Sequence, residues 1–358
     1  MDIDIKEILK EKKPVIDKVI EKYVPKKYTE EDIIFTLGPP SYKYNVEAPT
    51  KFLSEPVWDF LDRGGKRWRP VLFLLVAEAL GGNPDKYIDL VVFPELIHNG
   101  SIIVDDIEDM SEERRGRPVL HKLFGVDIAL NAGNILYYLA LLPLLKNKDK
   151  FDSKTLNRIY EVYTQEMLRI GFGQGTDIAW HNGLANADDV SEEEYLEMCS
   201  NKTGCIARLS TKVGAIVAGS SDEEAKKVGK FAETIGIAFQ IQDDILNVSE
   251  SELSKKKGGK GEDITEGKRS LMIIHTLQNA NKEDRERLLE ILKMHTTDQK
   301  IRDEAISIMK KYGSIEYSKK KAKKMVEESW GEMEKLLPES SAKKKLKAFA
   351  YYLIERDI

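Results

Sequence analysis

The sequence predicts an all-α protein folded as a single large helical bundle. Apolar residues recur at helical spacings along almost the whole chain, and no stretch alternates strictly enough to indicate a strand. Segments 87–104 and 127–145 are apolar on nearly every side, which is typical of helices in the middle of a bundle. No linker-like segment follows residue 50. We therefore expect an N-terminal helix and linker (1–50) packed on one helical domain (51–358).

Composition excludes several classes of function. The chain of 358 residues has 33% charged residues and a formal net charge of -5, so we expect no nucleic-acid partner. Its longest apolar run, 135–145, is shorter than the roughly 20 residues that span a bilayer. The N terminus lacks the pattern of a signal peptide. We therefore expect no transmembrane segment and a cytoplasmic location. Cys199 and Cys205 form no Cys-x-x-Cys pair and indicate neither disulfides nor a zinc site.

The first elements lead to a cationic block. Residues 4–24 have an amphipathic helical pattern, which Pro14 should interrupt or restart. After a Gly-Pro-Pro linker, a helix from about 49 to 61 should end at Arg63-Gly-Gly-Lys-Arg-Trp-Arg-Pro70. Flexible backbone and positive charge at the start of a helix can hold a phosphate. Considered alone, however, this block would be interpreted as a surface loop with solvated cations.

The apolar segment 87–104 delivers an acidic motif. Pro94 should kink this helix or mark its true beginning. Asp105-Asp-Ile-Glu-Asp109 follows, and then come Arg114 and Arg115. If the run is helical, Asp105 and Asp109 lie one turn apart with Cβ atoms about 6 Å from each other. Two carboxylates this close favour a hard divalent cation.

A second acidic motif lies far downstream, at Phe239-Gln-Ile-Gln-Asp-Asp-Ile-Leu-Asn247, where Asp243 and Asn247 repeat the one-turn spacing. Segment 251–261 is rich in Lys, Ser and Gly and is predicted to be a mobile flap that closes over phosphates. Cations alternating with carboxylates around one cavity would suit a substrate rich in phosphate.

Two other features are interpreted as local structure. The glycines of segment 171–175 are expected to serve close packing or access to a ligand. Asp188-Asp189 is expected to belong to the start of a helix.

Six ordered motifs make the chain resemble the trans-isoprenyl diphosphate synthases (polyprenyl synthetases), most of all the geranylgeranyl diphosphate synthases. They are Gly65-Lys-Arg-x-Arg-Pro70, Asp105-Asp-x-x-Asp109 with Arg114-Arg-Gly116, Gly173-Gln-x-x-Asp177, Lys202-Thr203, Phe239-Gln-x-x-Asp-Asp244 and Asp263-x-x-Glu-Gly-Lys268. The resemblance covers about residues 60–275. It implies an isoprenoid-synthase bundle with a central active-site cavity, usually a homodimer. Such enzymes join isopentenyl diphosphate to an allylic diphosphate: dimethylallyl, geranyl or farnesyl diphosphate.

The resemblance also implies roles for individual residues. A trinuclear Mg²⁺ cluster would be held by Asp105, Asp109 and Asp243. Residues around it, mostly acting through water or through the ligands, would be Asp106, Gln174, Asp177, Asp244 and Asn247. The allylic diphosphate would contact Arg114, Lys202 and Lys268, and isopentenyl diphosphate would contact Lys66, Arg69, His98 and Arg115. Thr203 and Gln240 would face the carbocation, and Lys260, in preference to Lys257, would be the flap lysine.

Product length is predicted from small residues before the first acidic motif. Gly100 and Ser101 are small where farnesyl synthases tend to have bulk, so a growing chain could pass them. Tyr137 and Tyr138 are then candidates for the floor of the tunnel, which predicts a C20 product. Asn247 stands where many members of the family have a third aspartate, and we expect activity to survive this change.

Alternative functions remain at this point. A farnesyl or longer-chain synthase would share all of these motifs. A terpene cyclase should lack the Gly-Lys-Arg block and should have a second metal motif with Ser or Thr and a later Glu, where Asn247 and Ser251 stand. A non-catalytic regulatory subunit usually loses an aspartate motif, whereas both are present here apart from Asn247.

Overall fold

The predicted all-α class is confirmed. The structure, a computed structural model, describes residues 3–249 and 260–354, and 77% of it is helical. Within this described part the strands are β1 (Glu113–Arg114) and β2 (Arg117–Pro118), which form one antiparallel pair. This short hairpin follows the first acidic motif directly in the chain.

The chain forms two compact units. The first comprises Met1–Glu161, Ser210–Ala225 and Ser340–Leu346, and the second comprises Val162–Leu209, Lys226–Glu339 and Lys347–Ile358. Helices α10 (Ser153–His181), α12 (Cys205–Val217), α13 (Asp222–Asn247) and α20 (Ser341–Ile354) each contribute residues to both units. The expected division after residue 50 stays a prediction.

The first unit contains the N-terminal helices and the first acidic motif. Its further elements are α1 (Ile5–Tyr23), α2 (Glu30–Leu37), α3 (Glu47–Pro49), η1 (Thr50–Ser54), α4 (Glu55–Asp62), α5 (Trp68–Ala79), η2 (Pro84–Val91), α6 (Val92–Glu108), α7 (Leu120–Phe124), α8 (Val126–Leu139), α9 (Leu142–Lys146) and η3 (Lys148–Lys150). The second unit contains η4 (Ala187–Asp189), α11 (Glu192–Cys199), η5 (Ser200–Gly204), α15 (Glu262–Glu266), α16 (Leu271–Asn279), α17 (Lys282–Met294), α18 (Gln299–Lys311) and α19 (Ser314–Met333).

The N-terminal helix corrects one expectation. α1 runs without a break through Pro14, which we expected to interrupt it. Pro14 lies on the exposed side of α1, where water can hydrate the carbonyl group that a proline leaves without its helical hydrogen bond. The opposite side buries Ile5, Leu9, Ile16, Ile20 and Tyr23. Burial of that apolar side holds the helix together despite the lost hydrogen bond.

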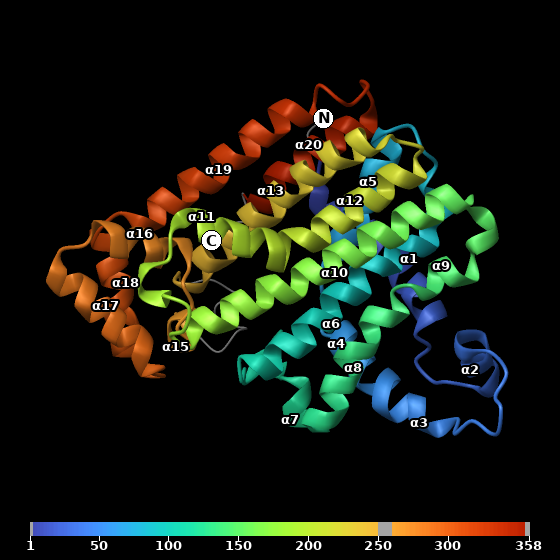
Figure 1. The fold of residues 1–358 in the computed structure, drawn as a ribbon, viewed down its shortest axis with the longest axis horizontal. Helices are drawn as coiled ribbons and strands as arrows, with labels where there is room; N and C mark the ends of the chain where they lie inside the picture. Colours follow the sequence, from blue (N-terminus) through green and yellow to red (C-terminus); the bar gives the residue numbers. More distant parts are fainter. Residues whose placement is uncertain (1–2, 250–259, 355–358) are drawn as a thin grey trace. The chain divides into compact units, whose positions relative to one another are not determined.

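Helices α6 and α8 form a close pair in the first unit (Figure 1). α6 begins at Val92, so Pro94 lies in its first turn and marks the beginning of the helix. Gly100 of α6 faces Gly133 of α8 so closely that a Cβ on Gly100 would lie 2.7 Å from the Gly133 carbonyl oxygen. The small size of Gly100 is therefore required by helix packing.

η2 and α6 together form one long apolar helical segment. By length and composition alone, Pro84–Glu108 could cross a membrane, but 61% of its most apolar window is buried in the structure. A helix that is apolar on most sides and buried in this way is typical of a protein core. We therefore assign this segment to the core of the first unit.

The contact between Gly100 and Gly133 leads to a stability prediction. Gly100→Ala is expected to lower the free energy of unfolding by about 1–3 kcal/mol, because a backbone oxygen has to move to admit the new methyl group. Gly331→Ala is the matched control: a Cβ there meets nothing within 4 Å, so it should stabilise α19 by about 0.5–1 kcal/mol. Urea denaturation followed by circular dichroism measures both changes. Equal effects of the two substitutions would contradict the packing argument.

Candidate functional site

The first acidic motif occupies the last turn of α6 in the first unit. The N–H of Asp109 donates to the carbonyl oxygen of Asp105 at 2.8 Å, so the helical turn reaches Asp109. Asp105 and Asp109 are therefore on one face of the helix, as predicted. Asp106 is buried and accepts hydrogen bonds from Arg114 through Nε at 2.7 Å and Nη2 at 2.5 Å. Burial raises the pKa of Asp106, although the charge of Arg114 opposes the rise.

The hairpin after this motif is held by arginines. Arg63, at the end of α4, donates through Nη1 to the carbonyl oxygens of Arg114 at 3.2 Å and Pro118 at 2.8 Å. Arg115 has a positive φ of 57° and donates to the carbonyl oxygens of Phe60 at 3.1 Å and Gly64 at 3.0 Å. The guanidinium of Arg115 also lies 4.4 Å from the ring of Phe60. These contacts fix the hairpin against the loop at residues 63–65.

The cations of the Gly-Gly-Lys-Arg-Trp-Arg block have different environments. Lys66 is exposed, whereas Arg67 and Arg69 are buried. Arg69 lies over the ring of Trp68, with 4.2 Å between the guanidinium carbon and the ring centroid. Gly65 has a φ of +119°, and a Cβ there would lie 2.7 Å from Nη1 of Arg67. The loop therefore needs glycine at this position for its backbone conformation and for the space beside Arg67.

His98 lies among these arginines. Burial lowers the pKa of His98 well below its usual value, and the charges of Arg69, Arg115, Arg67 and Arg114 lower it further. His98 is therefore neutral at physiological pH and can donate one ring N–H while it accepts at the other nitrogen. Arg69 and Arg115, two of the cations predicted to bind isopentenyl diphosphate, are thus close enough to His98 to act on its charge.

The second acidic motif occupies the last turns of α13 in the second unit. Asp244 is buried and accepts from the hydroxyl of Tyr195 at 2.9 Å and from Nε2 of Gln240 at 2.8 Å. Burial, with a contribution from Asp263, raises the pKa of Asp244 to about 7. Gln240 then uses its free Oε1 to accept the hydroxyl hydrogen of Thr203 at 2.9 Å. One hydrogen-bonded chain thus orients both residues that were predicted to face the carbocation.

Lys202 and Thr203 lie in η5, a short π-helical turn. The ammonium group of Lys202 donates to Asp177 of α10 at 2.6 Å, and Gln174 lies one turn before Asp177 on the same helix. A Cβ on Gly173 would collide with the backbone nitrogen of Lys202. Close packing therefore accounts for Gly173. It does not account for Gly171 or Gly175, where a Cβ would meet nothing within 4 Å.

A buried arginine supports the same turn and was missed in the sequence. Arg208 donates through Nη1 to the hydroxyl of Ser200 at 3.2 Å, inside η5. It pairs with Glu166 of α10 at 2.7 Å and with Glu233 of α13 at 2.5 Å. Three helices are thus tied to the turn that carries Lys202. Charged residues inside otherwise apolar helical patterns were the available signal, because a buried charge needs a partner.

Asn247 closes the second acidic motif but faces the backbone. Its Oδ1 accepts from the N–H of Asp263 at 3.3 Å, and its carbonyl oxygen accepts from the N–H of Gly261 at 2.9 Å. Asn247 is only 1% exposed. The side-chain oxygen of Asn247 therefore holds the start of α15 through the N–H of Asp263. This role needs a hydrogen-bond acceptor but no charge.

The remaining predicted cations of the second unit are engaged in ion pairs. Lys260 donates to Asp303 of α18 at 3.0 Å and lines a cavity of about 410 Å³ with Lys310 and Lys319. Lys268 forms an ion pair with Glu266. Lys257 lies outside the described residues, and the predictions for all three lysines stay predictions.

Asp188 and Asp189 lie in the short helix η4, directly before α11, which Ser191 caps in a capping box with Glu194. Asp188 has a further role that the sequence did not predict. It pairs with the buried Arg269 at 3.2 Å and with Lys293 at 2.5 Å. Arg269 also donates to the carbonyl oxygen of Ala187 at 2.8 Å. Asp188 thus fixes the loop that presents Lys268.

The candidate chain-length residues lie at the contact of α6 with α8. The hydroxyl of Ser101 donates to the carbonyl oxygen of His98 at 2.9 Å. A ring carbon of Tyr137 is 3.3 Å from the position that a Cβ on Gly100 would take. Tyr138 is 73% exposed. Tyr137 is therefore the tyrosine that borders Gly100, and the effect of these residues on product length stays a prediction.

The donor atoms of α6 suit a hard cation. Within residues 3–249 and 260–354, no group of three His, Cys, Asp or Glu side chains could hold a metal by itself. The pair Asp105 and Asp109 nevertheless offers carboxylate oxygens one helical turn apart, which are ligands that Mg²⁺ prefers and completes with water and substrate oxygens. The residues present therefore fit magnesium.

Comparison with known proteins places these features in a family. The family model described as polyprenyl synthetase matches residues 50–309. A short chain isoprenyl diphosphate synthase from Methanothermobacter thermautotrophicus is 39% identical over 294 residues, which are 82% of this chain and 87% of that protein.

Solved structures have the same fold. Geranylgeranyl pyrophosphate synthetase from Pyrococcus horikoshii Ot3 matches with a TM-score of 0.83 at 34% identity, over 98% of each chain. Geranylgeranyl pyrophosphate synthase from Corynebacterium glutamicum, solved with isoprenyl diphosphate and magnesium, matches with a TM-score of 0.82 at 22% identity, over 99% of this chain and 100% of that chain. At that identity the second match shows the fold alone.

The environment of His98 predicts a pH dependence of stability. Because its pKa is lowered in the folded protein, the unfolded chain binds more protons below about pH 6.5. The stabilisation is present above that pH, and its loss on acidification approaches about 1.4 kcal/mol per pH unit at most. Urea denaturation of the ligand-free protein between pH 7.5 and 5 should show a steeper loss for the wild type than for His98→Gln. Parallel curves would contradict the lowered pKa.

Proposed function

This chain belongs to the polyprenyl synthetase family of trans-isoprenyl diphosphate synthases, and we propose that it condenses isopentenyl diphosphate with allylic diphosphates to make geranylgeranyl diphosphate. The observation that carries the proposal is the end of α6. There, two carboxylates one turn apart are followed by a hairpin whose arginines are held in place by buried contacts. Such an arrangement suits a diphosphate with bound cations.

The proposed metal site consists of Asp105, Asp109 and Asp243, with three Mg²⁺ ions. Arg114, Lys202 and Lys268 would contact the allylic diphosphate. Magnesium, when bound, would neutralise charge on the departing diphosphate. The contacts of Asp106 with Arg114 and of Asp177 with Lys202 support roles in which these carboxylates orient cations. Preset cations cost no reorganisation when charge develops on a leaving group.

The proposed reaction needs no protein nucleophile. The allylic carbon–oxygen bond breaks, the double bond of isopentenyl diphosphate attacks the allylic carbocation, and a proton lost from the adduct passes to the released diphosphate. The oxygens of Thr203 and Gln240 would face the carbocation. Their hydrogen bonds to each other and to Asp244 support this role, because they fix the direction of both polar groups. The apolar helices would exclude water, which would quench the cation.

Isopentenyl diphosphate would bind Lys66, Arg69, His98 and Arg115. Arg115 donates to two carbonyl oxygens and to the amide oxygen of Asn99, all of them neutral acceptors. Burial lowers the pKa of Arg115 to about 10 and leaves it charged at neutral pH. A diphosphate would provide the negative charge that these partners do not. We further propose that the enzyme is a cytoplasmic homodimer, with Lys260 as the flap lysine.

An assay of purified protein tests the proposed activity. With Mg²⁺, labelled isopentenyl diphosphate and dimethylallyl, geranyl or farnesyl diphosphate, we expect chain extension to a C20 product, read by chromatography. EDTA should abolish extension and added Mg²⁺ should restore it. Asp105→Ala, Asp109→Ala and Asp243→Ala should each lower kcat about a hundredfold or more.

Asp152→Asn is the control for the aspartate variants, because Asp152 is exposed and only caps the start of α10. It should leave extension unchanged. Absence of extension with every primer would overturn the enzyme assignment, and would then favour a regulatory subunit. A cyclic hydrocarbon would favour a terpene cyclase. A farnesyl or much longer product would overturn only the C20 proposal.

The neighbours of Gly100 give a prediction for product length. Tyr137→Ala should yield products longer than C20, because the ring beside Gly100 would no longer close the tunnel. Tyr138→Ala is the matched control, and the exposure of Tyr138 supports an unchanged product. Chromatography of the dephosphorylated products measures the outcome. A C20 product from the Tyr137 variant would remove Tyr137 from the proposed floor.

A further inference from the structure

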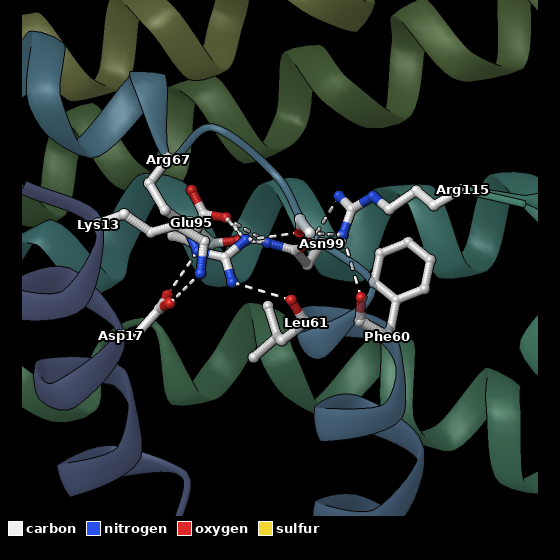
Figure 2. A network of polar contacts seen from close by, with 9 residues as sticks. Lys13, Asp17, Phe60, Leu61, Arg67, Glu95, Asn99 and Arg115 are labelled. Atoms are coloured by element: carbon white, nitrogen blue, oxygen red, sulfur yellow. Dashed lines mark hydrogen bonds and ion pairs between the residues drawn. The ribbon is translucent and has the colours of Figure 1, made fainter. Parts of the chain in front are cut away.

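We propose that the N-terminal helix α1 is a positioning element of the isopentenyl diphosphate site, acting through the contact of Asp17 with Arg67. The proposal rests on the proposed function, because it concerns how that substrate's side chains are held. The family model begins at residue 50, and α1 (Ile5–Tyr23) lies wholly before it. Figure 2 shows Asp17 and Arg67 meeting at one end of a network of polar contacts that extends to Arg115.

Arg67 is the centre of this network. It is 2% exposed, and its Nε donates to Asp17 at 2.7 Å. Its Nη1 donates to Glu95 of α6 at 3.1 Å and to the carbonyl oxygen of Gly64 at 3.3 Å. Its Nη2 donates to the carbonyl oxygen of Leu61 at 3.1 Å (Figure 2). One guanidinium thus links α1, the end of α4, α6 and the loop that contains Gly64 and Gly65, here called the glycine loop.

The network continues from Glu95 to a side chain of the proposed substrate site. Oε1 of Glu95 also accepts from Nδ2 of Asn99 at 2.8 Å. This bond leaves Oδ1 of Asn99 to accept from Nη2 of Arg115 at 3.3 Å. Arg115 and Arg67 also donate to the same Gly64 carbonyl oxygen, at 3.0 and 3.3 Å. Arg67 and Arg115 are therefore connected in two ways: through the side chains of Glu95 and Asn99, and through the carbonyl oxygen that both bind.

The glycine loop depends on the position of Arg67. Gly64 and Gly65 have positive φ angles of 115° and 119°, and Arg67 itself lies in the left-handed region with a φ of 53°. A loop with three such residues is held in shape by its contacts, because these conformations are unfavourable for arginine and entropically costly for glycine. Lys66 is carried between Gly65 and Arg67 and is exposed. The placement of Lys66 therefore follows from the contacts of Arg67.

Asp17 is one of the two carboxylates that balance the charge of Arg67. Burial opposes that charge, but Glu95 and Asp17 outweigh burial and raise the pKa of Arg67. Asp17 also pairs with Lys13 of α1. Loss of Asp17 would leave a buried Nε without its acceptor, and the guanidinium would then move toward Glu95 or toward water. Both movements would shift the glycine loop and Arg115.

The chain offers a matched control on the same helix. Lys22 of α1 donates to Asp89 of η2 at 2.9 Å, so this pair ties α1 to another element of the first unit. Neither Lys22 nor Asp89 has a contact with Arg67, Glu95, Asn99 or Arg115 in the described part of the chain. Lys22→Ala therefore loosens α1 without touching the network.

The test compares the Michaelis constants of two substrates in the full-length protein. Asp17→Ala is expected to raise the KM for isopentenyl diphosphate about tenfold and to leave the KM for farnesyl diphosphate unchanged. Asp17→Asn keeps an acceptor oxygen at the same place, so it should raise the first KM only about threefold. Lys22→Ala should change neither constant. Thermal unfolding of each variant shows whether it is folded.

Each outcome decides the proposal. An unchanged KM for isopentenyl diphosphate in folded Asp17→Ala overturns it. An equal rise for both substrates, or the same effect from Lys22→Ala, assigns Asp17 a general structural role and also overturns it. If Asp17→Ala does not fold, Asp17→Asn carries the test by the same criteria. Failure of the wild type to extend any primer would instead overturn the proposed function.

Discussion

The candidate site depends on the requirement that a buried guanidinium be hydrogen-bonded and its charge balanced. Arg67 meets this requirement with carboxylates of two helices and carbonyl oxygens of the loop between α4 and α5. Because the partners come from different elements, satisfying one side chain brings these elements into a single arrangement. The exposed cations of the site are then supported by a frame that has little freedom to move.

In the second unit, too, buried arginines support the more accessible lysines of the candidate site. Lys268 is followed by the buried Arg269, which binds the carbonyl oxygens of Ala187 and Gly267, just as Lys66 is followed by the buried Arg67. The turn with Lys202 is held by the buried Arg208. Arginine suits these buried places because its planar fork reaches several acceptors, whereas lysine suits the neighbouring accessible places as a compact charge. Cations that are adjacent in sequence therefore differ in what they bind.

The sequence predicted the helical class, the main helices and the one-turn spacing of Asp105 and Asp109, because these depend on local periodicity. It did not predict which cation of the block at 63–70 would be buried, since that depends on Asp17 and Glu95, which are distant in sequence. Glu95 carried a signal, because a charge within the apolar segment 87–104 requires a partner. Pro14 was misjudged because tertiary packing outweighed its local effect.

Asn247 lowers the negative charge at the end of α13 when no metal ion is bound. The end of α13 already contains Asp243 and Asp244, with Asp263 close enough to raise the pKa of Asp244. A carboxylate at 247 would accept the Asp263 N–H equally well but would add another negative charge to the group. The amide makes the same hydrogen bond without a charge and without a proton to gain or lose. The metal-free enzyme can therefore keep this acidic turn in shape with less mutual repulsion than a carboxylate at position 247 would cause.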